Sequence, residues 1–374
     1  MYTKYNSAYI LANRCQYWWE AATSQPWIRH FMRESGESGA WVFNSSLLPS
    51  LLLLVSPAFL SPLSTLFQTL TPMLKQIFGA IATTSVLTLY LISPALAQDP
   101  FRATNQRPIG EKTEAAFRAM FEQGDYFSAD RYLKEIPGNE QQEPLAYAMR
   151  ASLAYALNED YNSLGNYGKK TLDTARQLTS TDPLRGNLYS AVGHFLLGAS
   201  ALFREGTVKG TPQALAELRQ VYEYMDKAEA ISSTDPELNL LRGYMDLMVS
   251  VNLPFSNPEQ AIGRLQRFAG PKYLSERGVA VAYRDLKKFP QAIEAVDRAM
   301  KSSAGNPELY YLKGQILSTY GNKQKSASML QESVKNFDLA IAKKDQLPPD
   351  LVKQIERERR KAAQRLSVVA QQSR

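Results

Sequence analysis

The sequence predicts an all-α protein, built as an α-solenoid of about six helical hairpins followed by a C-terminal capping helix. Apolar residues recur at spacings of three and four nearly throughout residues 111–343, as in Ala115, Phe117 and Met120, and no long run alternates with period two. Turn-forming Gly, Pro and Asp residues separate these segments, so that successive hairpins begin near residues 111, 142, 184, 236, 273 and 307. A period of roughly 34 residues is typical of helical-hairpin repeats, which bury their apolar faces by stacking.

Composition excludes several other classes of protein. The chain has 374 residues, of which 44% are hydrophobic and 21% charged, close to the average for globular domains. A single Cys excludes a disulfide framework and a thiolate zinc site, because both need several sulfur atoms. The formal net charge of +7 is spread among mixed signs, so no nucleic-acid partner is expected.

The first 97 residues resemble an export leader preceded by an unrelated stretch. Lys75 precedes an apolar run at residues 77–92, and small residues at Ala95 and Ala97 follow it. This layout predicts a signal peptide at residues 73–97, cleaved between Ala97 and Gln98, and export to the periplasm or another extracytoplasmic compartment. The alternative is a signal anchor, with the chain attached to a membrane by residues 77–97 and in contact with it through residues 47–97.

Residues 1–72 contain all four Trp residues and the only Cys, unlike the rest of the chain. We interpret them as an upstream extension that is either not translated or else disordered or membrane-associated. The remaining boundaries are a polar linker at residues 98–110, the helical repeat domain at 111–343, and a basic helix and tail at 344–374.

Several units resemble the tetratricopeptide-repeat family. In the clearest unit, small and aromatic residues stand where that family has them: Ala280, Tyr283, Phe289, Ala292 and Ala299. Gly314 and Tyr310 mark the next unit, and Asp125-Tyr126 marks a similar turn in the first. Small residues at these positions allow two helices to pack closely. Leu164, where the family has a small residue, and the stretched third unit depart from the pattern.

The resemblance implies a right-handed solenoid that binds a protein or peptide partner in a concave groove lined by the first helix of each hairpin. The partner-facing positions are then Arg277, Arg284, Asp285, Tyr311, Gln315 and Thr319. On this reading, changing Arg277, Arg284 and Tyr311 to Ala would abolish partner capture and leave folding nearly intact.

Few residues suggest catalysis, so we expect a scaffold and not an enzyme. After residue 97 the only imidazole is His194, which lies in an apolar segment typical of a packed helix. The segment Gly165-Asn166-Tyr167-Gly168-Lys169-Lys170 lacks the residues of a phosphate-binding loop. No cofactor and no metal is expected. The alternative is an enzyme that uses the groove as its substrate cleft.

The last helix suggests a further alternative, because residues 351–366 carry six basic side chains and two acidic ones. Asp350 is a natural N-cap for this helix. Basic residues stabilise the C-terminal end of a helix, which explains part of the pattern. They also form a surface that suits an anionic partner or a membrane.

Overall fold

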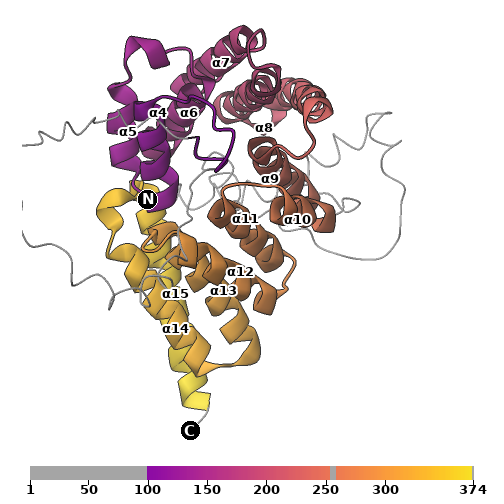
Figure 1. Ribbon diagram of the computed structural model, residues 1–374. Helices are drawn as coiled ribbons and strands as arrows, with labels where there is room; N and C mark the ends of the chain where they lie inside the picture. The colour runs from indigo at the N-terminus through magenta and orange to yellow at the C-terminus, as the bar shows by residue number, and fades with distance from the viewer. Residues whose placement is uncertain (1–98, 253–257, 373–374) are drawn as a thin grey trace, which may run out of the picture.

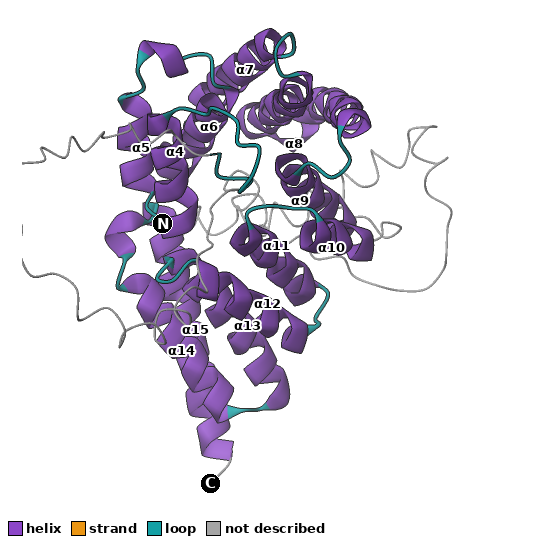
Figure 2. Cartoon of the chain, in the orientation of Figure 1, coloured by secondary structure: helices purple, strands orange, loops and turns teal. Residues whose placement is uncertain are grey.

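The computed structural model describes residues 99–252 and 258–372, and within them it is all-helical, with no β-strand (Figures 1 and 2). The all-α prediction is therefore confirmed. The helices and short helical turns run in the order α4 (Glu111–Phe117), η1 (Arg118–Gln123), α5 (Tyr126–Lys134), η2 (Gly138–Glu140), α6 (Pro144–Asn158), α7 (Tyr161–Leu178), α8 (Pro183–Ile231), α9 (Pro236–Asn252), α10 (Pro258–Arg267), α11 (Lys272–Asp285), α12 (Phe289–Ser302), α13 (Pro307–Gln324), α14 (Ala327–Ile341), η3 (Lys344–Gln346) and α15 (Pro349–Gln372).

Helices adjacent in the chain pack against each other as pairs. The pairs are α4 with α5, α6 with α7, α9 with α10, α11 with α12 and α13 with α14, and α15 packs on α14. Helix α8 bends at Gly206, whose φ of 76° is left-handed, and its two arms fold together so that Gly210 approaches Ala201. The leader, including Ala97 and Gln98, lies outside the described residues.

Four helices, α6, α8, α9 and α13, begin in the same way, with a polar N-cap residue followed by Pro. The four starts are Glu143-Pro144, Asp182-Pro183, Asp235-Pro236 and Asn306-Pro307. At each start the side chain of the N-cap residue accepts a hydrogen bond from a backbone N–H of the first turn. The first helical position tolerates Pro because a backbone N–H there would have no partner within the helix. The local sequence therefore determines where these helices begin.

The repeat-unit residues named from the sequence lie at helix contacts. Ala280, Ala292 and Ala299 are fully buried and Phe289 is nearly so, while Tyr283 is half-buried against the core. A Cβ added to Gly314 would lie 2.8 Å from the Phe337 ring, so only Gly allows α13 and α14 to approach this closely.

We expect replacement of Ala292 by Leu to lower the free energy of unfolding by about 1–3 kcal/mol, because the fully buried methyl group leaves no room for three more carbons. Urea denaturation followed by circular dichroism measures this change. Gln291→Leu is the matched control, because Gln291 is the exposed neighbour on the same helix. Equal stabilities for the two variants would contradict the packing of α11 on α12.

The first pair also contacts the beginning of α13, far along the chain. The Tyr126 hydroxyl donates to the Glu308 carboxylate at 3.0 Å, and the Asn306 amide donates to the Phe121 carbonyl at 3.1 Å. Gly124, with φ of 69°, makes the turn there, and a Cβ on it would lie 2.8 Å from Asn306. In Figure 1, α4 and α5 accordingly lie beside the C-terminal helices. The chain curves back on itself, whereas repeats in an open array contact only their neighbours.

Candidate functional site

The six residues named as partner-facing lie on α11 and α13, and most of them contact other parts of the chain. Arg277 is buried and paired with the buried Glu308 at the beginning of α13. Arg284 donates to Asp285 at 2.8 Å and to Gln315 at 2.8 Å, which ties α11 to α13. Thr319 is exposed. Whether the six residues bind a partner stays a prediction.

Helix α15 covers the part of α13 that carries Tyr311 and Gln315. The Tyr311 hydroxyl donates to Glu358 at 2.9 Å, and the Gln315 amide donates to the same carboxylate at 3.0 Å. Gln354 donates to Tyr311 at 2.8 Å. Burial and the Glu358 charge raise the pKa of Tyr311 well above its usual value of 10.0, so this hydroxyl stays a donor. The capping helix therefore binds a surface that the sequence analysis assigned to a partner.

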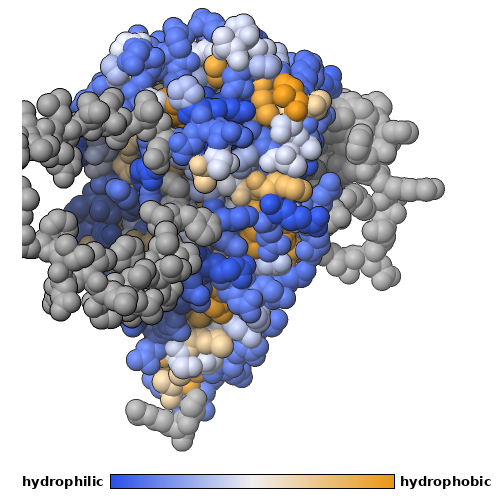
Figure 3. Space-filling model, in the orientation of Figure 1, coloured by the Kyte–Doolittle hydropathy of each residue, from blue (hydrophilic) through white to orange (hydrophobic). Residues whose placement is uncertain are grey.

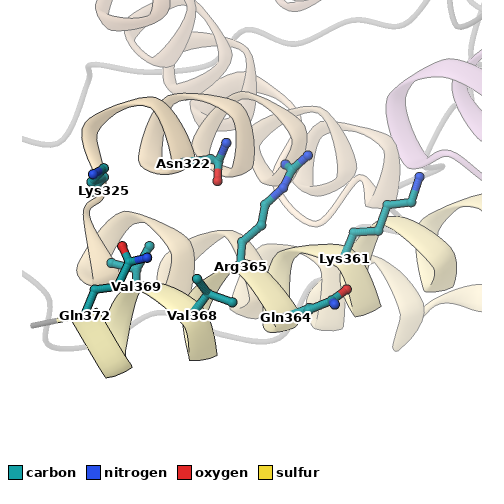
Figure 4. A pocket seen from close by; sticks show the side chains of 8 residues that line it. All are labelled: Asn322, Lys325, Lys361, Gln364, Arg365, Val368, Val369 and Gln372. Carbon is teal, nitrogen blue, oxygen red and sulfur yellow. The ribbon is translucent and has the colours of Figure 1, made fainter.

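Beyond Gln315, α13 and α15 enclose an open cleft of about 480 Å³ (Figure 4). Asn322 and Lys325 line it from the end of α13. The α15 side chains that line it are Lys361, Gln364, Arg365, Val368, Val369 and Gln372. Figure 4 shows Arg365 extending from α15 toward α13 across this space.

The cleft continues the face of α13 on which the sequence places the partner-facing residues Gln315 and Thr319. Gln315, Thr319 and Asn322 follow one another on α13 at spacings of four and three, the spacing of neighbours on one helix face. Continuing the predicted partner-facing face three residues beyond Thr319 would have reached Asn322. Lys325 could not have been found in this way, because it has left-handed φ of 51° and lies just past the end of α13.

A second cluster of charged residues lies where α6, α8 and α9 begin. The buried Arg185 guanidinium of α8 donates to Glu143 at 2.8 Å and 3.0 Å and to Glu237 at 3.1 Å. The Tyr189 hydroxyl donates to Glu237 at 2.6 Å. Burial opposes ionisation of Glu237, but Arg185 and Arg102 outweigh it and lower the pKa of this carboxyl below its usual 4.5. For Glu143, burial dominates and raises the pKa.

The N-terminal segment, residues 99–110, completes this cluster. Arg102 pairs with Asp99 and also with Asp235 at 2.6 Å. Arg107 pairs with Asp182 at 2.9 Å. Phe101 is buried, so the segment expected as a polar linker is packed into the fold. The acids at these helix starts thus cap the helices, and Arg side chains neutralise them.

His194 lies on the first arm of α8, packed against the second. It is 8% exposed, its Nδ1 lies 2.6 Å from the Glu217 carboxylate, and its ring stacks on Tyr224 with centroids 5.4 Å apart. Its Nε2 is buried and has no hydrogen-bond partner among the described residues. Its position is that of a packed side chain, as its apolar segment predicts.

The described residues offer neither a cluster of metal ligands nor a helix suited to spanning a membrane. Residues 99–252 and 258–372 contain no group of three or more His, Cys, Asp or Glu side chains arranged to hold a metal ion. In the same part of the chain, no helix has the length and hydropathy to cross a membrane. The face in Figure 3 is mainly hydrophilic, with small separate hydrophobic areas.

The fold and the cleft together define an all-α protein of paired helices with a basic cleft at its C-terminal end. The chain matches no protein-family model, no curated protein and no solved structure. Its function must therefore be inferred from its own residues.

Proposed function

We propose that this chain is a non-catalytic helical-repeat scaffold, of the tetratricopeptide type, that mediates a protein–protein interaction through a concave groove lined by the first helix of each hairpin. Its six hairpins would form a solenoid closed by α15. Consecutive helix pairs and small residues at Ala280, Ala292 and Gly314 support this proposal. The position and contacts of His194 favour a scaffold over an enzyme.

The observation that carries the proposal is the open cleft between α13 and α15. It continues a helix face on which one segment already docks, because Glu358 of α15 accepts from both Tyr311 and Gln315. Near the beginnings of α8 and α9 the chain's own N-terminal segment is bound, through ion pairs of Arg102 with Asp235 and of Arg107 with Asp182. A partner would thus bind at the C-terminal end, where the cleft is open.

A large side chain introduced into the cleft tests this function. Gln364 lines the cleft from α15 and is exposed, so Gln364→Trp should fill the space and prevent binding without disturbing the core. The matched control is Gln371→Trp, an exposed position on the same helix that does not line the cleft. Partners captured by the wild-type chain would be identified by mass spectrometry, purified and measured against both variants. Equal affinity for both folded variants would refute the cleft as the binding site.

Export of this scaffold is a separate part of the proposal. We expect the mature protein to begin at or near Gln98, one residue before the described fold. Asp99 is buried, and its carboxylate accepts the Phe101 N–H at 2.8 Å, which anchors the chain directly after the expected cleavage point. N-terminal sequencing of protein isolated from cells measures this. Peptides containing Trp18 or Trp41 in the mature protein would contradict it.

A second candidate function is binding to an anionic membrane surface through α15. Arg357, Arg360 and Lys361 are exposed on this helix, and none of them forms an ion pair within the described part of the chain. Cosedimentation with phosphatidylglycerol vesicles tests it, with phosphatidylcholine vesicles as the control. Replacing the three residues with Gln should then abolish cosedimentation.

A further inference from the structure

The lining of the cleft between α13 and α15 has one sign of charge. Among the described residues that line it, Lys325, Lys361 and Arg365 are charged, and none contributes a carboxylate. Arg365 donates to the Ser318 hydroxyl at 2.9 Å, which holds its guanidinium between the two helices. Lys325 and Lys361 are exposed and form no ion pair within residues 99–252 and 258–372. The positive charge of the cleft is therefore available to a ligand.

One carboxylate, Glu358, lies a single helical turn before Lys361 and keeps its charge, but three cations outnumber it. Glu358 accepts from Tyr311 and Gln315, and Asp338 on α14 pairs with Arg359 at 2.9 Å. The C-terminal ends of α13 and α15 each add partial negative charge, roughly half an elementary charge, so together they offset about one lysine. The cleft thus keeps a net positive charge.

The remaining lining suits a peptide. Asn322, Gln364 and Gln372 offer amide donors and acceptors, which the backbone of an extended segment requires. Val369 is buried and Val368 is 47% exposed, which gives the cleft an apolar contact for one small side chain. The volume of about 480 Å³ is within the range of pockets that enclose a small ligand, about 300–1,000 Å³. It suits a few residues, and its concave shape does not suit a flat lipid surface.

We propose that the cleft binds an acidic segment of a partner protein, in which Asp or Glu side chains pair with Lys325, Lys361 and Arg365. Arg365 would take one carboxylate through its planar guanidinium, since this geometry favours two parallel hydrogen bonds. An aliphatic side chain of the segment would contact Val368. This inference rests on the proposed scaffold function and specifies the chemistry of its partner.

Fluorescence anisotropy with the full chain tests the inference. The probe is a fluorescein-labelled peptide in which Asp and Glu alternate with Ala and Leu, acetylated and amidated so that only side chains carry charge. We expect binding that weakens steeply with ionic strength. The same peptide with Asn and Gln in place of the acids should not bind. Lys325→Glu with Lys361→Glu should weaken binding by about tenfold to a hundredfold, which is about 1.4–2.7 kcal/mol, since two exposed ion pairs are lost and the new carboxylates repel the peptide.

A matched charge reversal separates local contacts from net charge. Lys301 on α12 and Lys335 on α14 are exposed, and Lys301→Glu with Lys335→Glu changes the net charge equally without touching the cleft lining. This control should bind the acidic peptide nearly as the wild type does. Circular dichroism confirms that both double variants are folded.

Three results would overturn the inference: no binding of the acidic peptide, equal weakening by the two double variants, or equal binding of the neutral peptide. Binding to phosphatidylglycerol vesicles without binding to the peptide would assign the cations to a membrane and also overturn it. The proposed function fails separately. If Gln364→Trp abolishes partner capture but charge reversal does not, the scaffold function stands and the acidic chemistry is wrong.

Discussion

Replacing Arg185 with Met should lower the free energy of unfolding by about 3–5 kcal/mol, because two buried carboxylates would lose the cation that they share. Arg185 is 2% exposed and binds both Glu143 and Glu237. Met keeps much of the packing volume, so the loss is mainly electrostatic. Urea denaturation at neutral pH measures it. Lys227→Met is the control, because Lys227 pairs with Glu223 on the exposed surface of α8 and should change stability little.

The unfolding free energy lost on replacing Arg185 should depend on pH, because the carboxyls of Glu143 and Glu237 titrate in the folded protein. In the wild type the pKa of Glu237 lies below its usual 4.5, so its ionised form stabilises the fold above pH 4.5, and this stability is lost as the pH falls through the folded pKa. The pKa of Glu143 is raised, so protonation of this group favours the folded state.

Without Arg185 the pKa of both carboxyls should rise. The variant's deficit should then be largest at neutral pH and shrink as the pH falls through the raised pKa of each carboxyl toward its wild-type pKa, which for Glu143 lies above 4.5 and for Glu237 below it. A deficit that stays constant from neutral to acidic pH would show that lost packing, and not unpaired charge, causes the destabilisation.

Replacing Arg277 with Leu should also cost about 3–5 kcal/mol, since it leaves the buried Glu308 without its cation. Tyr126 would remain as a hydrogen-bond donor to Glu308. Adding Glu308→Leu should restore part of the stability, because it removes the unpaired buried charge, while the buried Tyr126 hydroxyl loses its acceptor. Arg267→Leu, at an exposed position on α10, is the control.

This expectation is the opposite of the one drawn from the sequence, in which Arg277 faces a partner and its removal leaves folding nearly intact. Denaturation of Arg277→Leu decides between them. An unchanged unfolding free energy with lost partner capture would restore the sequence-based interpretation. Loss of stability that Glu308→Leu partly reverses would make Arg277 a structural residue.

Local patterns predicted the helices well because their causes are local. Apolar spacing and the breakers between segments place the helix pairs, and an acid or Asn before Pro marks the beginnings of four helices. Side-chain environment was harder to predict. A helical stripe shows which residues share a face, but it does not show what covers that face, and α15 returns to cover Tyr311 from 47 residues further along the chain.

The sequence by itself determined the all-helical class, the positions of most helix ends and the small residues at helix contacts, since each depends on neighbours within a few turns. Only the tertiary structure decided that residues 99–110 are packed, that Arg185 and Arg277 are buried ion-pair partners, and that the cleft beside Lys361 is open. Each of these depends on how the chain curves, which brings Tyr126 to Glu308 across 182 residues. Curvature accumulates from small rotations between successive pairs, and no short stretch of sequence encodes it.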